Sequence, residues 1–297
     1  MARYVLIFMA LSALSCGKLR EGVVREIEFP EHEPSLAVTA ILTEGAPELP
    51  ISVFRSAGIL DSAGSQAAVD AVVTVEGGGA AFAWNGSEGF LDLQQDSGWQ
   101  WTSGAEVLLA ADAPDLPAVS ARAVVPPHPE AEVTEVLGAD TTTSPWIGEP
   151  QVVDRVTFSL TNHPGVRDAY VVLLEQRESE FGDAWTPMWA DPDIATAERT
   201  EFGWVTGGYF IDDLGLDETP LDGFVFERIR WDLDEVPLPR RVRVQAVSLE
   251  LFKHYQSLEA YFAALDNPFA EPASVYGNVE GGFGVLGLVR EEVFVFE

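Results

Sequence analysis

The chain has 297 residues, of which 47% are apolar, and its 48 acidic and 17 basic side chains give a formal charge of −31. Such a field repels phosphate backbones and anionic lipid surfaces, which argues against nucleic acid as a partner. The charge indicates either an ordinary solvated acidic surface or a cation-binding face. At roughly 100–200 residues per domain, the length predicts two domains.

The N-terminus has the pattern of a secretory signal peptide over residues 1–15. Arg3 is followed by an apolar run, residues 4–14, which falls short of the roughly 20 residues that span a bilayer. Cys16, the only cysteine of the chain, follows directly, at the position of an acylated lipobox cysteine. We therefore expect a lipid anchor on Cys16, a tether over residues 16–33 and no transmembrane helix; a leftover cysteine in an ordinary signal peptide is the alternative.

Short runs of alternating apolar residues follow the tether. They are separated by turn signals such as Gly77-Gly78-Gly79 and Asn85-Gly86. Short strands with turns between them are typical of a β-sandwich, which we place at residues 34–125. The runs lie at residues 36–40, 51–53, 69–75, 82–84 and 119–125.

The segment Pro126-Pro127-His128-Pro129 predicts a domain boundary, because proline cannot donate to a sheet ladder. Beyond it, residues 130–297 read as a β-rich C-terminal domain. Residues 178–222 read as irregular and acidic. The strands are expected at residues 152–160, 170–176, 224–231, 241–247 and 288–296.

One helix is expected near residues 248–266, within a fold that is otherwise all-β. Ser248 is a plausible N-cap, and Pro268 would end the helix. Apolar residues recur between them at three- and four-residue steps, as on the buried face of an amphipathic helix. They are Leu251, Tyr255, Leu258, Phe262 and Leu265.

The C-terminal quarter contains Asn267-Pro268-Phe269-Ala270-Glu271-Pro272 and then a glycine-rich signature from Val275 to Gly287. With the segments 34–38, 51–57 and 210–213, it resembles the bacterial lipoprotein family catalogued as domain of unknown function 4249. The resemblance implies an envelope lipoprotein with an Ig-like or transthyretin-like N-terminal sandwich and a β-rich C-terminal domain. Members are often encoded beside TonB-dependent receptors, and the family assigns no reaction. The membrane face stays open.

The signature includes a match to the dinucleotide-binding fingerprint. Gly282-Phe283-Gly284-Val285-Leu286-Gly287 has the required spacing, but a working fingerprint opens a helix, and a β-rich segment follows here. We therefore expect Gly281, Gly282 and Gly284 to be structural, in closely packed backbone beside the last strand. No cofactor is predicted.

Motifs for catalysis or metal binding are missing from the sequence. There is no Gly-x-Ser-x-Gly elbow, and His32, His128, His163 and His254 lie far apart, so we expect no catalytic residues, no enzyme activity and no metal site. Acidic pairs could supply oxygen ligands to Ca²⁺, although solvated loops are the preferred interpretation. These residues are Asp191, Asp193, Asp212, Asp213, Asp217 and Asp222.

The tryptophans are the remaining candidates for function. Trp99 and Trp101 would share one face of a strand and are expected to fill a core. Trp185, Trp189 and Trp204 lie in the long irregular segment, where binding residues are common. Core packing is the preferred interpretation of the pair Trp185 and Trp189, and contact with a ligand or partner through the three tryptophans is the functional alternative.

Together these features predict a non-catalytic binding or assembly accessory, anchored in the outer membrane through Cys16. By the family resemblance, its partner would be an outer-membrane protein such as a TonB-dependent receptor. A structural or adhesive surface module is the alternative, and an unrecognised hydrolase is a third. A Trp-lined pocket would favour a ligand, and an exposed apolar patch a protein partner.

Overall fold

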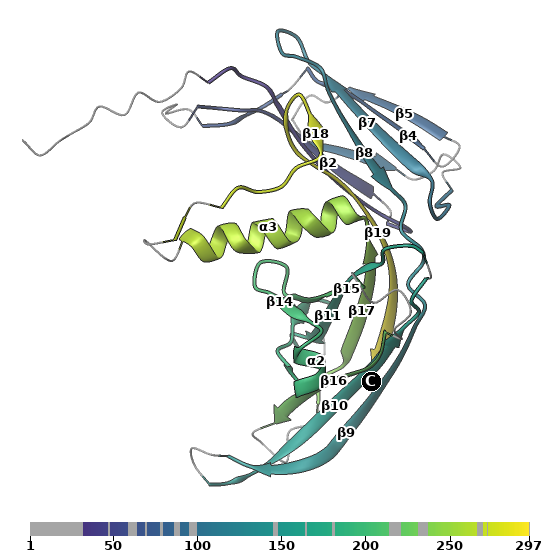
Figure 1. Ribbon diagram of the computed structural model, residues 1–297, viewed down its shortest axis with the longest axis vertical. Helices are drawn as coiled ribbons and strands as arrows, with labels where there is room; N and C mark the ends of the chain where they lie inside the picture. The colour runs from purple at the N-terminus through teal and green to yellow at the C-terminus, as the bar shows by residue number, and fades with distance from the viewer. Residues whose placement is uncertain are drawn as a thin grey trace, which may run out of the picture. The chain divides into compact units, whose positions relative to one another are not determined.

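Figure 1 shows the computed structural model, in which the chain divides into two compact units, Met1–Glu33 and Pro34–Glu297. All elements described below lie in the second unit. The predicted signal peptide, Cys16 and the tether up to residue 31 fall outside the described residues. Those residues are 32–46, 48–58, 64–68, 70–77, 80–85, 90–94, 100–144, 148–163, 165–179, 182–213, 221–230, 237–265, 270–271 and 273–296.

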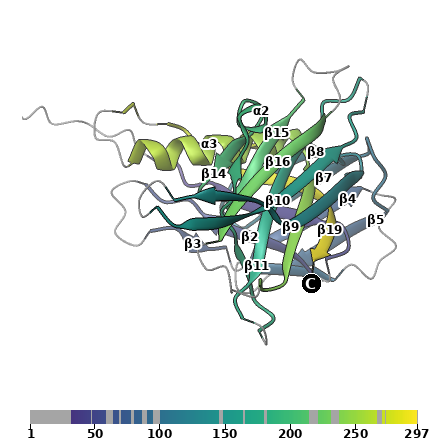
Figure 2. The same ribbon diagram turned by 90° about the horizontal axis from the view of Figure 1, so that it is seen from below.

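Three β-sheets make up the second unit, as the strand labels in Figures 1 and 2 show. The largest is ten-stranded, and eight of its strands follow one another in the order β14 (Glu201–Gly203), β15 (Gly208–Asp212), β11 (Ala169–Arg177), β17 (Arg240–Val247), β19 (Phe283–Phe296), β1 (Leu36–Thr43), β2 (Glu48–Arg55) and β3 (Gln66–Ala67). The other two pair off this path, β12 (Trp185–Pro187) with β11 and β6 (Phe90–Gln94) with β2. A five-stranded sheet has the order β18 (Val279–Glu280), β8 (Val119–Val124), β7 (Glu106–Asp112), β4 (Val72–Gly77) and β5 (Ala80–Asn85). A four-stranded sheet has the order β13 (Asp191–Pro192), β16 (Leu221–Arg230), β10 (Pro150–Leu160) and β9 (Ala131–Thr143).

The predicted mostly-β sandwich fold is confirmed. Strand β8 shows why the sequence folds this way, since Val119, Ala121 and Ala123 are buried while the residues between them are exposed. A strand with one buried face produces this period of two. Strand β7 has the same alternation and was missed by the sequence analysis.

The first core lies in residues 36–125 together with part of the C-terminus. Its members come from β1, β2, β4, β7 and β8, and they are joined by Val279, Leu286 and Leu288. Trp101 packs against this core, as expected, whereas Trp99 lies outside the described residues. The boundary at residues 126–129 stays a prediction, but the first core reaches past it to β18 and β19.

The second core lies between the C-terminal part of the ten-stranded sheet and the four-stranded sheet. Phe158, Phe224 and Phe226 stack at its centre, with ring centroids of Phe158 5.0 and 5.6 Å from the other two. Phe294 and Phe296, at the end of β19, pack against it. Strand β19 therefore contributes to both cores.

Two predictions about strands were wrong. Residues 178–222 are not simply irregular, because they contain β12, β13, β14, β15 and the short helix α2 (Ile194–Ala197). Most of these elements have two to four residues, which is too short to show a periodic pattern. The last strand starts at Phe283 and not at residue 288, because its glycines, which are usually depleted in strands, are here required by close packing.

The predicted helix is confirmed as α3 (Leu249–Leu265). Ser248 does occupy the N-cap position, since its carbonyl accepts the Phe252 N–H, but its hydroxyl accepts the Leu288 N–H of β19. Only the first half of the predicted apolar face is buried, because Phe262 is 45% and Leu265 60% exposed. In the described part of the chain, no helix is long and apolar enough to cross a bilayer.

The glycine-rich signature packs backbone directly against backbone. A Cβ on Gly282 would lie under 3.0 Å from the Leu36 carbonyl oxygen, and one on Gly284 would meet the backbone of Val38. Gly284 also has a φ of +106°, which L-residues rarely adopt. Close packing is therefore confirmed for Gly282 and Gly284, which set the distance between β19 and β1, whereas a Cβ on Gly281 would make only ordinary van der Waals contacts.

Asn278 fixes the same region through its side-chain amide. Its Nδ2 donates to the carbonyls of Arg122 (2.8 Å) and Leu286 (3.0 Å), and its Oδ1 accepts the Leu286 N–H (2.8 Å). One side chain thus joins β8 of the five-stranded sheet to β19 of the ten-stranded sheet.

A buried ionic cluster lies in the second sandwich. Asp154 pairs with Arg230 (2.8 Å) and Arg240 (3.1 Å), and Arg240 also pairs with Glu135 (3.0 Å). Burial raises the pKa of Glu135, and the charge of Arg240 only partly opposes that shift. The ionised form of Glu135 is therefore less favourable in the folded chain than in the unfolded chain.

We expect Gly284→Ala to lower the free energy of unfolding by about 1–3 kcal/mol more than Gly104→Ala, the range for overpacking. Both glycines have positive φ, but Gly104 has no atom within 4 Å of its added Cβ. Urea denaturation of both variants measures the difference. Equal losses would show that backbone conformation alone, and not close packing, requires glycine at 284.

The raised pKa of Glu135 predicts a pH dependence of stability. Between the ordinary value of 4.5 and the raised folded value, the folded state binds more protons than the unfolded state, so this contribution is complete below 4.5 and is lost as pH rises through the folded pKa. The stability of the wild type relative to Glu135→Gln should fall over that window. Chemical denaturation at a series of pH values checks this, with Glu132→Gln as the exposed control. A pH-independent difference would contradict it.

Candidate functional site

Two exposed tryptophans stack on each other at the edge of the second sandwich. Trp189 follows β12 and is 48% exposed, and Trp204, in the turn between β14 and β15, is 77% exposed. Their ring centroids are 5.3 Å apart with an interplanar angle of 19°. Phe202 meets both rings edge-on, at 4.7 and 5.1 Å. We call Trp189, Phe202 and Trp204 the aromatic surface.

The aromatic surface is anchored in the core beneath it. Phe202 contacts Tyr209, which in turn contacts Phe226, with centroids 5.0 and 4.3 Å apart. The Tyr209 hydroxyl donates to the Ala190 carbonyl beside Trp189. Burial raises the pKa of Tyr209 to about 12, so the hydroxyl keeps its proton and this bond at neutral pH.

Helix α3 holds the turn that carries Trp204. The Glu259 carboxylate accepts the backbone N–H groups of Val205 (2.8 Å) and Thr206 (3.2 Å) through one oxygen. Gly203 is enclosed at this point, because an added Cβ would lie under 3.0 Å from the side chains of Phe210 and Glu259. The hydrogen bonds from Glu259 and the close packing around Gly203 therefore both fix the turn.

A groove of about 250 Å³ opens on the other side of the same turn. The turn, helix α3 and strands β11 and β17 line the groove. The lining is mostly apolar. It consists of Val171, Leu173, Val205, Thr206, Gln245, Tyr255 and Leu258.

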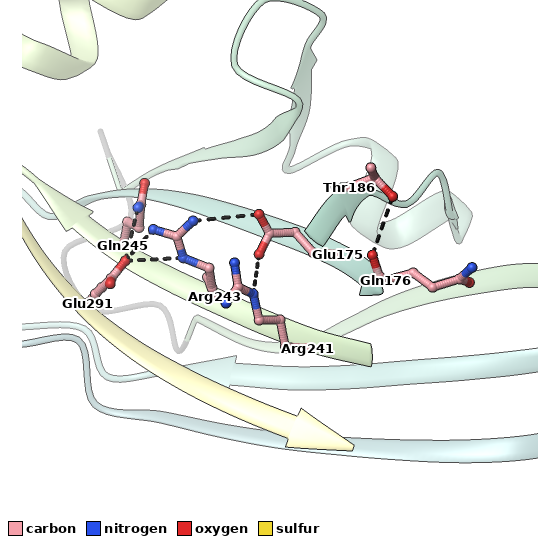
Figure 3. A network of polar contacts seen from close by, with 7 residues as sticks. All are labelled: Glu175, Gln176, Thr186, Arg241, Arg243, Gln245 and Glu291. Carbon is pink, nitrogen blue, oxygen red and sulfur yellow. Dashed lines mark hydrogen bonds and ion pairs between the residues drawn. The ribbon is translucent and has the colours of Figure 1, made fainter. Parts of the chain in front are cut away.

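Next to the groove, ionic side chains cross β11, β17 and β19 (Figure 3). Glu175 pairs with Arg241 and Arg243, and Arg243 also donates to Glu291 at 2.7 Å. Gln245 donates to the same Glu291 oxygen at 3.1 Å. The charges satisfy one another, so the network joins three strands.

Trp185 belongs to this network and not to the aromatic surface. The guanidinium of Arg241 lies 4.4 Å and that of Arg177 5.5 Å from the Trp185 ring centroid. Its ring is half-buried, whereas Trp189 and Trp204 are exposed. Of the three tryptophans singled out from the sequence, the structure brings two together.

The acidic residues considered as calcium ligands have structural contacts instead. Asp191 accepts the Trp189 indole N–H (2.9 Å), Asp193 caps α2 through the Thr196 N–H (2.8 Å), and Asp212 pairs with Arg167. Asp213 is buried, Asp222 offers its backbone carbonyl to Arg199, and Asp217 lies outside the described residues. Within the described ranges, no group of three His, Cys, Asp or Glu side chains could hold a metal ion.

The described histidines also make structural contacts. His163 shares a hydrogen bond of 2.8 Å with the buried Asp168. His254 on α3 contacts the Tyr276 carbonyl at 2.6 Å and so ties the glycine-rich signature to the helix. His128 contacts the adjacent Pro129 carbonyl at 3.1 Å.

Sequence reasoning missed Glu259 and the ionic network. Arg241, Arg243 and Gln245 alternate with Val242 and Val244, a pattern that does predict a polar face on that strand. No local pattern could identify Glu259, because its partners lie more than fifty residues earlier in the chain.

The comparisons with known proteins give one family. Residues 24–293 match the family described as Domain of unknown function (DUF4249), which confirms the predicted resemblance over most of the chain. No curated protein matches. Among solved structures, a Corynebacterium diphtheriae protein described as membrane-anchored aligns with 74% of this chain and 55% of its own, at 10% identity and a TM-score of 0.21. A similarity this low supports no inference about function.

Replacing Glu259 should loosen the turn without unfolding the sandwich. Hydrogen bonds to a charged group contribute about 1.5–3 kcal/mol, so we expect Glu259→Ala to speed amide exchange at Val205 and Thr206 by at least about tenfold. Hydrogen exchange measured by NMR tests this, with Glu250→Ala on the same helix as control. Unchanged exchange at both amides would show that the carboxylate does not hold the turn.

Proposed function

We propose that this chain, which belongs to the DUF4249 family, is a non-catalytic binding protein of the cell envelope that captures a partner through the aromatic surface. The observation that carries the proposal is the stacked pair of Trp189 and Trp204, exposed on a rigid support. Aromatic residues held in this way lose little entropy on binding and are frequent at interface hot spots.

The exposure is costly unless something covers it. Burying a large apolar side chain completely contributes about 1.5–3 kcal/mol, so the exposed 48% of Trp189 and 77% of Trp204 forfeit only part of that amount. Two other tryptophans within the described ranges avoid that cost, since Trp185 lies under Arg241 and Trp101 packs against the first core. A partner that covers Trp189 and Trp204 would recover this free energy.

The polar groups around the aromatic surface support binding more than catalysis. Asp191 orients the Trp189 ring, Asp193 caps α2 and Glu259 holds the turn. These three carboxylates position the rings and the turn of the aromatic surface, as binding requires. General acid–base catalysis would require a carboxylate directed at a substrate within hydrogen-bond reach.

The location and the class of partner extend the proposal. A lipid on Cys16 would keep the protein at the outer membrane, where a weak contact gains from high effective concentration. By resemblance to the family, the partner would be an outer-membrane protein such as a TonB-dependent receptor. The described residues contain neither Cys16 nor residues 17–31 of its tether.

The test is capture of the partner by the full-length lipoprotein solubilised in detergent. Trp189→Ala with Trp204→Ala should reduce the recovered partner by at least about tenfold, since hot-spot residues contribute 2 kcal/mol or more. Trp185→Ala is the matched control, because it removes the same ring from a site outside the aromatic surface. Quantitative mass spectrometry measures recovery, and near-ultraviolet circular dichroism verifies the fold.

Two results would decide against the proposal. A folded double variant that recovers the same partners in the same amount would place the contact elsewhere. A double variant that loses its tertiary signal would show that the rings act mainly as an edge cover for the second sandwich. In that case a structural role would replace the binding role.

A further inference from the structure

We infer that the aromatic surface recognises a basic protein segment, whose arginine or lysine side chains lie on the exposed face of Trp204 and whose apolar residue enters the adjacent groove. The inference rests on the proposed function and specifies the chemistry of the partner. It draws on the charges around the surface, the free face of one ring and the size of the groove.

The rim of the aromatic surface is acidic. Asp191, which accepts the Trp189 indole N–H, is exposed, as are Glu198 and Glu201. Glu198 and Glu201 precede Trp204 by six and three residues, and Glu201 lies on the groove face of β14, opposite Phe202. Arg199, the one cation between residues 189 and 206, donates to the Asp222 carbonyl and lies 4.1 Å from the Phe224 ring centroid. A partner of opposite charge meets the least repulsion here and associates faster.

Trp204 offers a suitable face for a cation. One side of its ring stacks on Trp189 and its edge is met by Phe202, yet 77% of the residue stays exposed. Tryptophan is the strongest of the aromatic side chains for a cation over its face. The chain already uses this contact internally, where Arg241 lies over Trp185.

The groove beyond the turn suits a single side chain. Its volume of about 250 Å³ is below the usual range of about 300–1,000 Å³ for small-molecule sites. Leu173, Tyr255 and Leu258 make its lining apolar. The groove lies on the α3 face of the sheet, opposite the face of Phe202 and Tyr209. Val205 and Thr206 line it and directly follow Trp204, so a segment that reaches both features passes over the sheet edge at this turn.

A lipid surface is the competing occupant, because tryptophan also favours membrane interfaces. The acidic rim disfavours it, since anionic headgroups would meet Asp191, Glu198 and Glu201. The experiment therefore includes vesicles as a separate arm.

The probe is a short fluorescent peptide of alternating arginine and leucine, compared with one that has glutamate in place of arginine. Its dissociation constant is measured by anisotropy at two salt concentrations, with the full chain bearing Cys16→Ala so that no lipid contributes. We expect binding of the arginine peptide only. Trp189→Ala with Trp204→Ala should weaken it by at least about tenfold.

Charge reversal separates a local rim effect from the general acidity of the chain. Glu198→Lys with Glu201→Lys should weaken binding by about tenfold and reduce its salt dependence. Glu76→Lys with Glu106→Lys changes the net charge equally at exposed sites of the first sandwich and should alter binding less than about twofold. Equal effects of the two pairs would overturn the inference, because attraction would then be non-specific.

The remaining outcomes distinguish this inference from the proposed function. If the arginine peptide binds the tryptophan variant unchanged, while that variant still loses its envelope partner, the binding role stands and the basic-segment inference fails. Tryptophan-dependent binding to zwitterionic vesicles without peptide binding would assign the surface to lipid and overturn the inference.

Discussion

The close pairing of β19 with β1 is the contact on which the rest of the second unit depends. Residues 283–289 of β19 pair in parallel with β1, and residues 289–296 pair antiparallel with β17. One strand therefore belongs to both sandwiches, and its side chains pack in both cores. Gly282 and Gly284 make this possible, because a side chain at either position would push β1 away.

The same strand fixes where the aromatic surface can lie. From β19 the sheet continues through β17, β11 and β15 to β14, the edge strand before Trp204. Ser248, the N-cap of helix α3, accepts the Leu288 N–H of β19 through its hydroxyl, and Glu259 of the same helix accepts the Val205 N–H of the turn. The turn is therefore connected to β19 in two ways, through the hydrogen-bonded strands of the sheet and through helix α3.

The sequence predicts those parts of the fold that depend on local periodicity. Alternation identifies β8, β10, β11 and β17, and the three- and four-residue spacing identifies α3. Periodicity fails for β12 to β15, whose formation depends on partners far away in the chain. It fails again at the glycine-rich signature, where a compositional rule against glycine in strands is overridden by the need for close approach.

The candidate site was predictable only in part, for a related reason. Three tryptophans in one segment indicate an aromatic site, but burial separates them, and burial depends on the whole fold. Trp185 is covered because the pairing of β11 and β17 brings Arg241 over it, at a residue more than fifty positions later in the chain. Trp189 and Trp204 stay open because the strands beside them, β13 and β14, are short edges.

The distribution of the few cations explains why an acidic rim can act locally in a chain that is acidic everywhere. Several of the seventeen basic residues are used inside the second sandwich or on its ionic network, including Arg230, Arg240, Arg241 and Arg243. There they neutralise carboxylates that would otherwise be buried alone, a costly arrangement. Arginines used in this way cannot screen the surface, so the exposed carboxylates near Trp204 keep their field. The stabilisation of the core and the charge of the proposed binding surface are therefore two consequences of the same placement of arginine.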